Sequence, residues 1–256
     1  MPRKILKSKP LIEAIFELKW KLQEIREGIR IDPHYKILVG SLFSKLREDY
    51  PYHEMLPAAS IPDDIAGHVI QHRFRKGKAE WPLLQIGPGI LTVNDTEGYI
   101  WEDFEKRINI AINALIESYP ELETFKINSI LLRYIDAVEF NFDSNNIFNF
   151  LSQKMKTEVT LYDALFNNTG VDSNPSSFDL RYSFPCEEPK GIIHLRFVRG
   201  KKDNQEALIW ETMVQSTGEN VPVIASGVAD WLNSAHNLTD DWFFKLIEGE
   251  LERRFE

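Results

Sequence analysis

Hydrophobic and polar residues alternate along residues 12–23. This period of two predicts a strand with one buried face, although apolar residues in the same stretch also fit the spacing of a helix. Asp32 and Pro33 suit a helix start, as an N-cap followed by a proline in the first turn. Apolar residues then recur every three or four positions over residues 35–46, which predicts a helix that ends before Pro51.

Two strands and a long amphipathic helix are predicted next. Residues 68–76 and 83–94 have the composition of strands, with a turn between them at Gly77. The glycines in residues 87–89 (GPG) predict a bend in the second of these strands. Residues 101–119 carry apolar side chains at three- and four-residue intervals, which is the most regular helical pattern in the chain.

The second half of the chain shows a similar succession of strands and helices. Residues 127–140 alternate but are apolar on both sides, which predicts a central strand covered on both faces. The C-terminal region is predicted to form two helices, the second capped by Thr239 with Asp240 and Asp241 in its first turn. The remaining predicted elements are a short helix at 147–155, a loop at 167–177, and a three-stranded meander at 178–184, 192–198 and 207–213.

This order of elements predicts an α+β fold in which antiparallel sheets carry helices on one face. The two halves spell nearly the same string of elements, so we expect a tandem β-α-β-β-(β)-α duplication of the helix-grip or TATA-binding-protein-like kind. A ferredoxin-like N-terminal half is the alternative, because the first 140 residues also read as strand, helix, two strands, helix and strand. The predicted lobes are residues 1–122 and 123–256, or else one continuous domain.

Composition and charge narrow the classes of function. The chain has 256 residues, of which 43% are hydrophobic, and this is enough to bury a sizeable core. A formal net charge of -9 disfavours nucleic-acid binding by long-range attraction. The single cysteine, Cys186, excludes an intrachain disulfide and fits a reducing compartment. The basic N-terminus lacks the apolar core of a secretory signal, and no apolar run is long enough to span a membrane, so we expect a cytoplasmic protein without membrane association.

The sequence contains no recognisable catalytic or metal-binding constellation. His68 and His72 have a spacing that suits a metal on a helix, but a strand of that length separates them by roughly 13 Å. Residues 87–89 lack the lysine and hydroxyl ending of a phosphate loop. Cys186 precedes two glutamates, which raise the pKa of a thiol and oppose its use as a nucleophile. We therefore expect no metal and no cofactor.

Arginines within predicted strands are the least ordinary feature of the sequence. A guanidinium group in a sheet is typical of a paired carboxylate or of a bound anion. We expect Arg133 to pair with a carboxylate, Asp136 or Glu211, because it lies in the most apolar strand, and Arg196 to be the better candidate for an anion ligand. Solvated positions on the sheet surface are the alternative. The four candidate anion-binding residues are Arg196, Arg133, Arg181 and Arg73.

Short segments of the chain resemble an uncharacterised, sporadically distributed bacterial protein family of about this length. They are residues 9–14 (KPLIEA), 87–89 (GPG) followed by 99–104 (YIWEDF), and 132–135 (LRYI). The family usually has asparagine after the last segment, where this chain has Asp136. The resemblance implies an accessory bacterial gene without an assigned activity, and the patchy distribution suggests toxin-antitoxin or phage-defence systems. It implies no catalytic residues.

Two functions from different classes follow. The absence of catalytic motifs, the acidic charge and the aromatic C-terminal region favour a non-enzymatic protein-binding or regulatory protein that acts through a protein partner or as a homo-oligomer. The alternative is a small-molecule or nucleotide-binding protein, or an enzyme, with a pocket between sheet and helices and an arginine that anchors an anionic ligand. Trp101, Trp231 and Trp242 are expected to pack in the core or in an interface.

Overall fold

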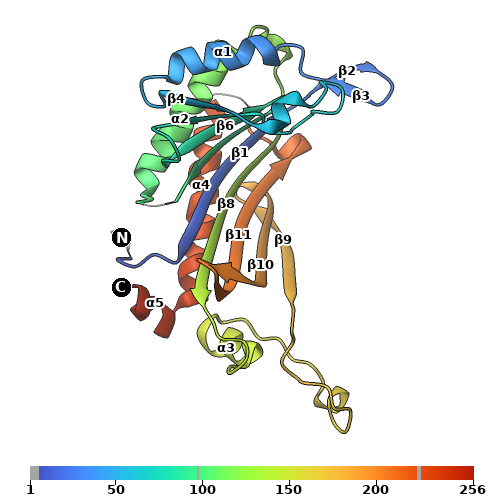
Figure 1. The fold of residues 1–256 in the computed structure, drawn as a ribbon, viewed down its shortest axis with the longest axis vertical. Coiled ribbons are helices and arrows are strands. Elements are labelled where there is room, and N and C mark those ends of the chain that lie inside the picture. The colour runs from blue at the N-terminus through green and yellow to red at the C-terminus, as the bar shows by residue number, and fades with distance from the viewer. Residues whose placement is uncertain (1–5, 97, 224–225) are drawn as a thin grey trace.

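A computed structural model describes residues 6–96, 98–223 and 226–256; residues 1–5 of the basic N-terminus lie outside the described part. A nine-stranded antiparallel sheet with helices on one face forms the body of the molecule (Figure 1). The α+β prediction is therefore confirmed. The strands are β1 (Leu11–Trp20), β2 (Gln23–Arg26), β3 (Ile29–Ile31), β4 (Tyr52–Met55), β5 (His72–Arg75), β6 (Leu83–Gly87), β7 (Ile90–Asp95), β8 (Ile127–Glu139), β9 (Asp179–Glu187), β10 (Lys190–Lys202) and β11 (Gln205–Thr217).

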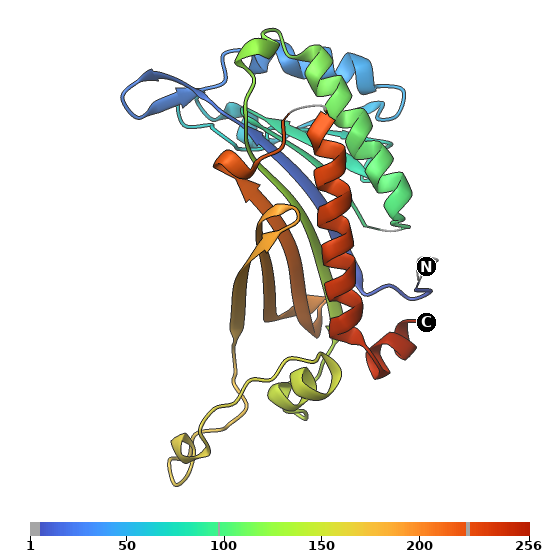
Figure 2. The same ribbon diagram turned by 180° about the vertical axis from the view of Figure 1, so that it is seen from behind.

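The helices cover the side of the sheet that faces the core. The long helix α4 packs against β8 and β11 and stands in front of them in Figure 2, whereas α1 and α2 cover the other end of the sheet. Apolar residues of β1, α1, α2 and α4 belong to one buried cluster, and a second cluster joins β8, β10 and β11 to α3 and the C-terminal helices. The helices are α1 (Tyr35–Leu46), α2 (Trp101–Ser118), α3 (Ile147–Lys154), α4 (Ser226–Ile247) and α5 (Glu250–Phe255).

The strand order of the sheet repeats in its two halves. The order is β4-β5-β6-β7-β1-β8-β11-β10-β9. In each half, the last strand of the meander, β7 or β11, lies beside the first strand of that half, β1 or β8. The two first strands, β1 and β8, pair with each other at the centre of the sheet. This is the arrangement that a tandem repeat predicts. The subset β6-β7-β1-β8 also forms two interleaved split βαβ units, as the ferredoxin-like alternative requires. One sheet crosses the predicted boundary between residues 122 and 123.

The predicted bounds of one strand and of the first helix differ from the structure. Residues 83–94 form a hairpin of two strands, because Pro88 and Gly89 make a tight turn with Gly89 at a φ of 75°. The helix predicted to begin at Asp32 begins at Tyr35, after a turn in which the Asp32 carboxylate accepts hydrogen bonds from the His34 amide at 3.1 Å and from the Trp20 indole at 2.9 Å.

The two predicted C-terminal helices are a single helix, α4. Thr239 does not cap a second helix, because its hydroxyl donates to the carbonyl oxygens of Ala235 and His236 one turn earlier. Threonine bonded in this way is tolerated inside a helix. The short strands β2, β3 and β4 were not predicted, since three or four residues are too few to show a period.

The segment that precedes β1 is held against the C-terminal end of the chain. The Ser8 amide donates to the Phe255 carbonyl at 2.9 Å, and the Ala137 amide of β8 donates to the Pro10 carbonyl at 2.9 Å. These bonds position residues 6–10 beside α4 and β8, where they close one side of the cavity described below. Within the described residues, no helix is both long enough and apolar enough to cross a membrane.

Candidate functional site

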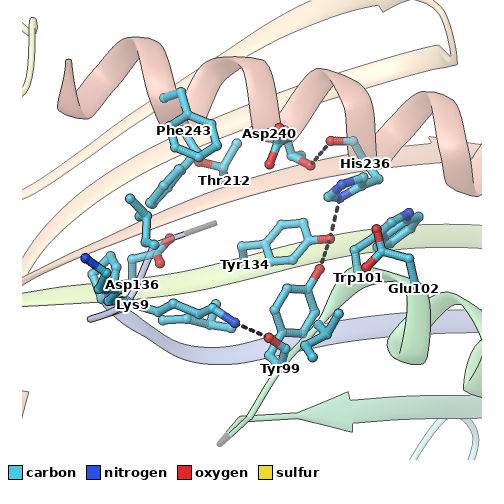
Figure 3. A pocket seen from close by; sticks show the side chains of 17 residues that line it. Lys9, Tyr99, Trp101, Glu102, Tyr134, Asp136, Thr212, His236, Asp240 and Phe243 are labelled. Carbon is cyan, nitrogen blue, oxygen red and sulfur yellow. Dashed lines mark hydrogen bonds between the residues drawn. The ribbon is translucent and has the colours of Figure 1, made fainter. Parts of the chain in front are cut away.

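A cavity of ≈ 330 Å³ lies between α4 and the sheet, and we call it the helix–sheet cavity (Figure 3). Four regions that are distant in sequence form its walls: the segment around the start of β1, the start of α2, the adjacent strands β8 and β11, and the middle of α4. Its lining residues are Leu6, Lys7, Lys9, Pro10, Leu11, Tyr99, Ile100, Trp101, Glu102, Tyr134, Asp136, Thr212, His236, Thr239, Asp240, Phe243 and Phe244.

Strand alternation determines which side chains of the sheet enter the cavity. Successive residues of a strand point to opposite faces, so Tyr134 and Asp136 share the face of β8 that is covered by α4. Thr212 lies opposite Tyr134 in the antiparallel pair of β8 and β11 and therefore joins them on this face. The sheet thus contributes a row of polar groups to the wall of the cavity.

A chain of hydrogen bonds closes one end of the cavity. The hydroxyl groups of Tyr99 and Tyr134 lie 2.9 Å apart, and the Tyr134 hydroxyl is 2.9 Å from Nδ1 of His236 (Figure 3). The His236 ring stacks on Trp101 with centroids 3.7 Å apart and an interplanar angle of 10°. These contacts connect β8, α2 and α4, so this end of the cavity is rigidly built.

Asp136 is the most unusual group in the cavity. Its side chain is only 3% exposed, and its carboxyl group makes no hydrogen bond or ion pair within the described part of the chain. Burial raises the pKa of Asp136 to about 8, and the attraction of Lys202 offsets this only in part. Thr212 beside it is 1% exposed, and its hydroxyl oxygen also lacks a hydrogen-bond partner among the described residues. Two buried polar groups at one end of the cavity are thus left to a ligand or to water.

The other charged residues of the cavity stand nearer to solvent. Lys7 and Glu102 are exposed, and Asp240 is half-buried. The Lys9 ammonium donates to the Tyr99 carbonyl oxygen, which turns it toward α2 (Figure 3). Among the described residues, three carboxyl groups and two lysines line the cavity, with Asp136 the most deeply buried of the five.

The four predicted anion-binding arginines lie outside this cavity, on the opposite face of the sheet. Arg196 donates to Asp179 at 2.8 Å and to Glu211 at 2.8 Å, and Arg181 donates to the same Asp179 at 2.8 Å. Arg73 donates to Gln85 at 2.7 Å, at the other end of the sheet. Most of these guanidinium groups thus engage carboxylates or amides of the protein itself, and an anion site among them stays a prediction.

The predicted pairing of Arg133 with a carboxylate is confirmed for Glu211 and wrong for Asp136. Arg133 Nε lies 3.7 Å from a Glu211 carboxylate oxygen, so this is an ion pair without a hydrogen bond. Asp136 is three positions further along β8, which places it on the opposite face of the strand. Glu211 on β11 lies between Arg133 on β8 and Arg196 on β10 and bridges the two strands.

We expect Glu211→Gln to lower the free energy of unfolding by about 1 kcal/mol, because it leaves two half-exposed arginines side by side without their shared carboxylate. Chemical denaturation measures this loss, which should shrink at about 1 M salt as the charges are screened. Glu206→Gln is the matched control, since Arg199 is the one ion-pair partner of Glu206 within the described part of the chain. Equal losses in the two variants, or no salt dependence, would contradict the bridging role.

The sequence raises His68, His72 and Cys186 as candidates for metal binding or nucleophilic chemistry, and the structure gives the surroundings of each. His72 lies in β5 and its ring is 2.8 Å from that of His53 on β4, whereas His68 precedes the strand, with a φ of 61°. The described residues hold no group of three His, Cys, Asp or Glu side chains able to bind a metal ion. The pKa of Cys186 is raised, chiefly by burial and then by Glu187.

The small-molecule alternative predicts a pocket between sheet and helices, but with an arginine as its anchor, and the sequence does not identify the residues that line the cavity. Residues 9–14, 99–104 and 132–135 carry the family resemblance, and each supplies residues that line the cavity. An acid in the most apolar strand is a signal in the sequence for the buried group, although the sequence favours it as a partner for Arg133. Comparisons of the sequence found no matching protein-family model and no match among curated proteins.

Proposed function

We propose that this protein binds a small, largely apolar organic molecule in the helix–sheet cavity. The observation that carries the proposal is Asp136, a buried carboxyl group that faces the cavity and has no hydrogen-bond partner among the residues that the structure describes. A polar group in such a place costs free energy unless something satisfies it, and a bound ligand is the simplest partner. This is the small-molecule alternative drawn from the sequence, with an acid in place of an arginine as the anchor.

The shape and lining of the cavity support this proposal. A volume of ≈ 330 Å³ is at the lower end of the range of about 300–1,000 Å³ typical of ligand pockets. The surface of its wall is more apolar than polar, as in most small-molecule sites, and its apolar side chains come from several elements: Leu6, Pro10, Leu11, Ile100, Trp101, Phe243 and Phe244. We expect the ligand to be about the size of a single substituted ring.

The arrangement of the acid-base groups favours binding over catalysis. The hydroxyl group of Tyr134 points toward Tyr99 and His236, while Asp136 lies on the other side of the Tyr134 ring (Figure 3). A general acid and a general base that act on one substrate must reach the same reacting atoms. Tyr99, Tyr134 and His236 bond to one another, and Asp136 lies apart from them, so the groups do not converge on one point and we propose a binding protein.

A variant that fills the cavity tests the function. Leu11 lines the cavity from the start of β1, and Leu11→Trp should occupy the space that a ligand needs. We expect ligand-observed NMR to find fragments that bind the natural protein and are lost from Leu11→Trp. Ile37→Trp is the control, because Ile37 is 68% exposed on α1 and should leave binding unchanged. Fragments that still bind a folded Leu11→Trp protein would overturn the proposal.

One observation supports the other function drawn from the sequence, the binding of a protein partner. The chain between α3 and β9 extends away from the body of the molecule as a long loop that includes the short 3-10 helix Asp163–Leu165 (Figure 1). Three of its apolar side chains are more exposed than is usual for their type: Tyr162 at 76%, Leu165 at 60% and Val171 at 60%. A partner that covers this loop is compatible with a ligand in the cavity.

A further inference from the structure

The ligand of the helix–sheet cavity must satisfy Asp136, and the chemistry around that residue restricts what the ligand can be. We infer that the ligand is a protonated organic amine whose ammonium group pairs with the Asp136 carboxylate and whose apolar body fills the rest of the cavity. This inference rests on the proposed function and adds a ligand class to it. Three features of the cavity lead to it.

The first feature is the uncompensated acid. In the empty protein, Asp136 is buried without an ion pair, so its charged form is disfavoured. A cation beside it would supply the missing partner inside a site of low dielectric, where a hydrogen-bonded ion pair is strong. The Thr212 hydroxyl can accept a second N–H bond from the same ammonium group, and this would satisfy the other buried polar group.

The second feature is the aromatic wall near the acid. Figure 3 places Asp136 and Thr212 at the end of the cavity that Phe243 closes from α4, with the Tyr134 ring on their other side. Aromatic faces attract cations through the ring quadrupole, and the attraction grows when water is excluded. A carboxylate surrounded by aromatic rings is a combination suited to organic cations, and the apolar part of an amine gains by burial in the same place.

The third feature is the charge at the inner end of the cavity, which opposes anionic ligands. Asp136 is the buried acid there, and Lys9 is directed to the Tyr99 carbonyl. A ligand carboxylate or phosphate at the inner end would meet a buried acid of like charge, which is costly. A neutral ligand that accepts a hydrogen bond from protonated Asp136 is the remaining alternative, and it has the opposite dependence on pH.

Matched amines and alcohols test the inference. The probes are 2-phenylethylamine with 2-phenylethanol, cyclohexylmethylamine with cyclohexylmethanol, and hexylamine with hexanol, titrated by calorimetry or NMR. We expect each amine to bind about tenfold or more tightly than its alcohol at pH 7.5, which corresponds to about 1.4 kcal/mol. Amine affinity should rise about tenfold per pH unit from pH 6 toward pH 8, because Asp136 must release its proton before it pairs with the cation.

Two variants show whether Asp136 is responsible. Asp136→Asn keeps the size and polarity of the side chain but removes its charge, so the preference for amines and its pH dependence should both disappear. Glu102→Gln removes the same charge from the exposed rim of the cavity and should leave both unchanged. If Asp136→Asn still binds amines more tightly than alcohols, another acid is responsible for the preference and the inference is overturned.

The outcomes for the inference and for the proposed function are separable. If the alcohols bind as tightly as the amines, or if amine binding does not strengthen from pH 6 to pH 8, the ligand class is wrong while binding in the cavity stands. The ligand class is also wrong, and binding in the cavity also stands, if none of the three amines binds at millimolar concentration while other fragments bind the natural protein and fail to bind Leu11→Trp. If no fragment binds the natural protein in that experiment, the proposed function itself fails.

Discussion

The stability of this protein is expected to fall as the pH rises from about 4 to about 8, by roughly 1.4 kcal/mol per pH unit from Asp136 alone. The pKa of Asp136 is raised from 3.8 to about 8 by burial. Between these two values the folded protein holds a proton on Asp136 that the unfolded chain releases. The unfolded state is therefore favoured increasingly as pH rises, and the effect ends once the folded protein also loses the proton.

Urea denaturation of the natural protein and of Asp136→Asn across this pH range isolates the contribution of Asp136. Other groups also titrate, but they are common to both proteins and cancel in the difference. We expect the two proteins to converge near pH 4 and the variant to be more stable by several kcal/mol at pH 8. Parallel curves over the whole range would mean that Asp136 ionises normally, and that it is hydrated or paired in the folded protein.

A second large effect is expected at Trp20. Its side chain is completely buried at the end of β1, with the ring stacked on Phe125 at a centroid distance of 5.4 Å. Its indole nitrogen donates to Asp32 at 2.9 Å, which ties the end of β1 to the start of α1. Trp20→Ala should lower the free energy of unfolding by about 4 kcal/mol, because it opens a large cavity and removes one of the hydrogen-bond donors to Asp32.

The packing and hydrogen-bond contributions of Trp20 can be separated. Trp20→Phe keeps most of the buried ring and removes the donor to Asp32, so a smaller loss of about 1–2 kcal/mol is expected. Chemical denaturation of the three proteins at one pH gives both values. A loss below about 1 kcal/mol for Trp20→Ala would show that this end of β1 is not packed as described.

Asp136 connects stability to function in this protein. A neutral residue at that position should stabilise the fold at neutral pH, yet the same change should remove the preference for amines. Residues that lower stability and remain in a binding site are expected where the site is organised for its ligand and not for the empty protein. The two sets of experiments on Asp136→Asn therefore test one physical statement, that the cavity is built around an unpaired acid.

The elements predicted well from the sequence are those whose pattern is local and long. Residues 101–119 and 127–140 each show many repeats of a helical or strand period, and the structure has α2 and β8 there with shifts of at most one residue. Alternation alone also predicts that Arg133 and Asp136 lie on opposite faces of β8, since residues an odd number of positions apart in a strand point to different faces. The short strands lacked enough residues to show a period.

Two features could not be predicted without the tertiary structure: the continuity of α4, where the sequence predicts two helices, and the lining of the cavity. The stop predicted at Thr239 was a local signal, but the hydroxyl satisfies itself within the helix and the apolar face of α4 continues across the sheet. The cavity joins Lys9, Tyr99, Asp136 and His236, which are far apart in the chain. The sequence by itself determined the periods and therefore the faces of its elements. Which faces meet, and how deeply an acid is buried between them, was decided by strand order and helix packing, because these depend on contacts between distant segments that no local pattern encodes.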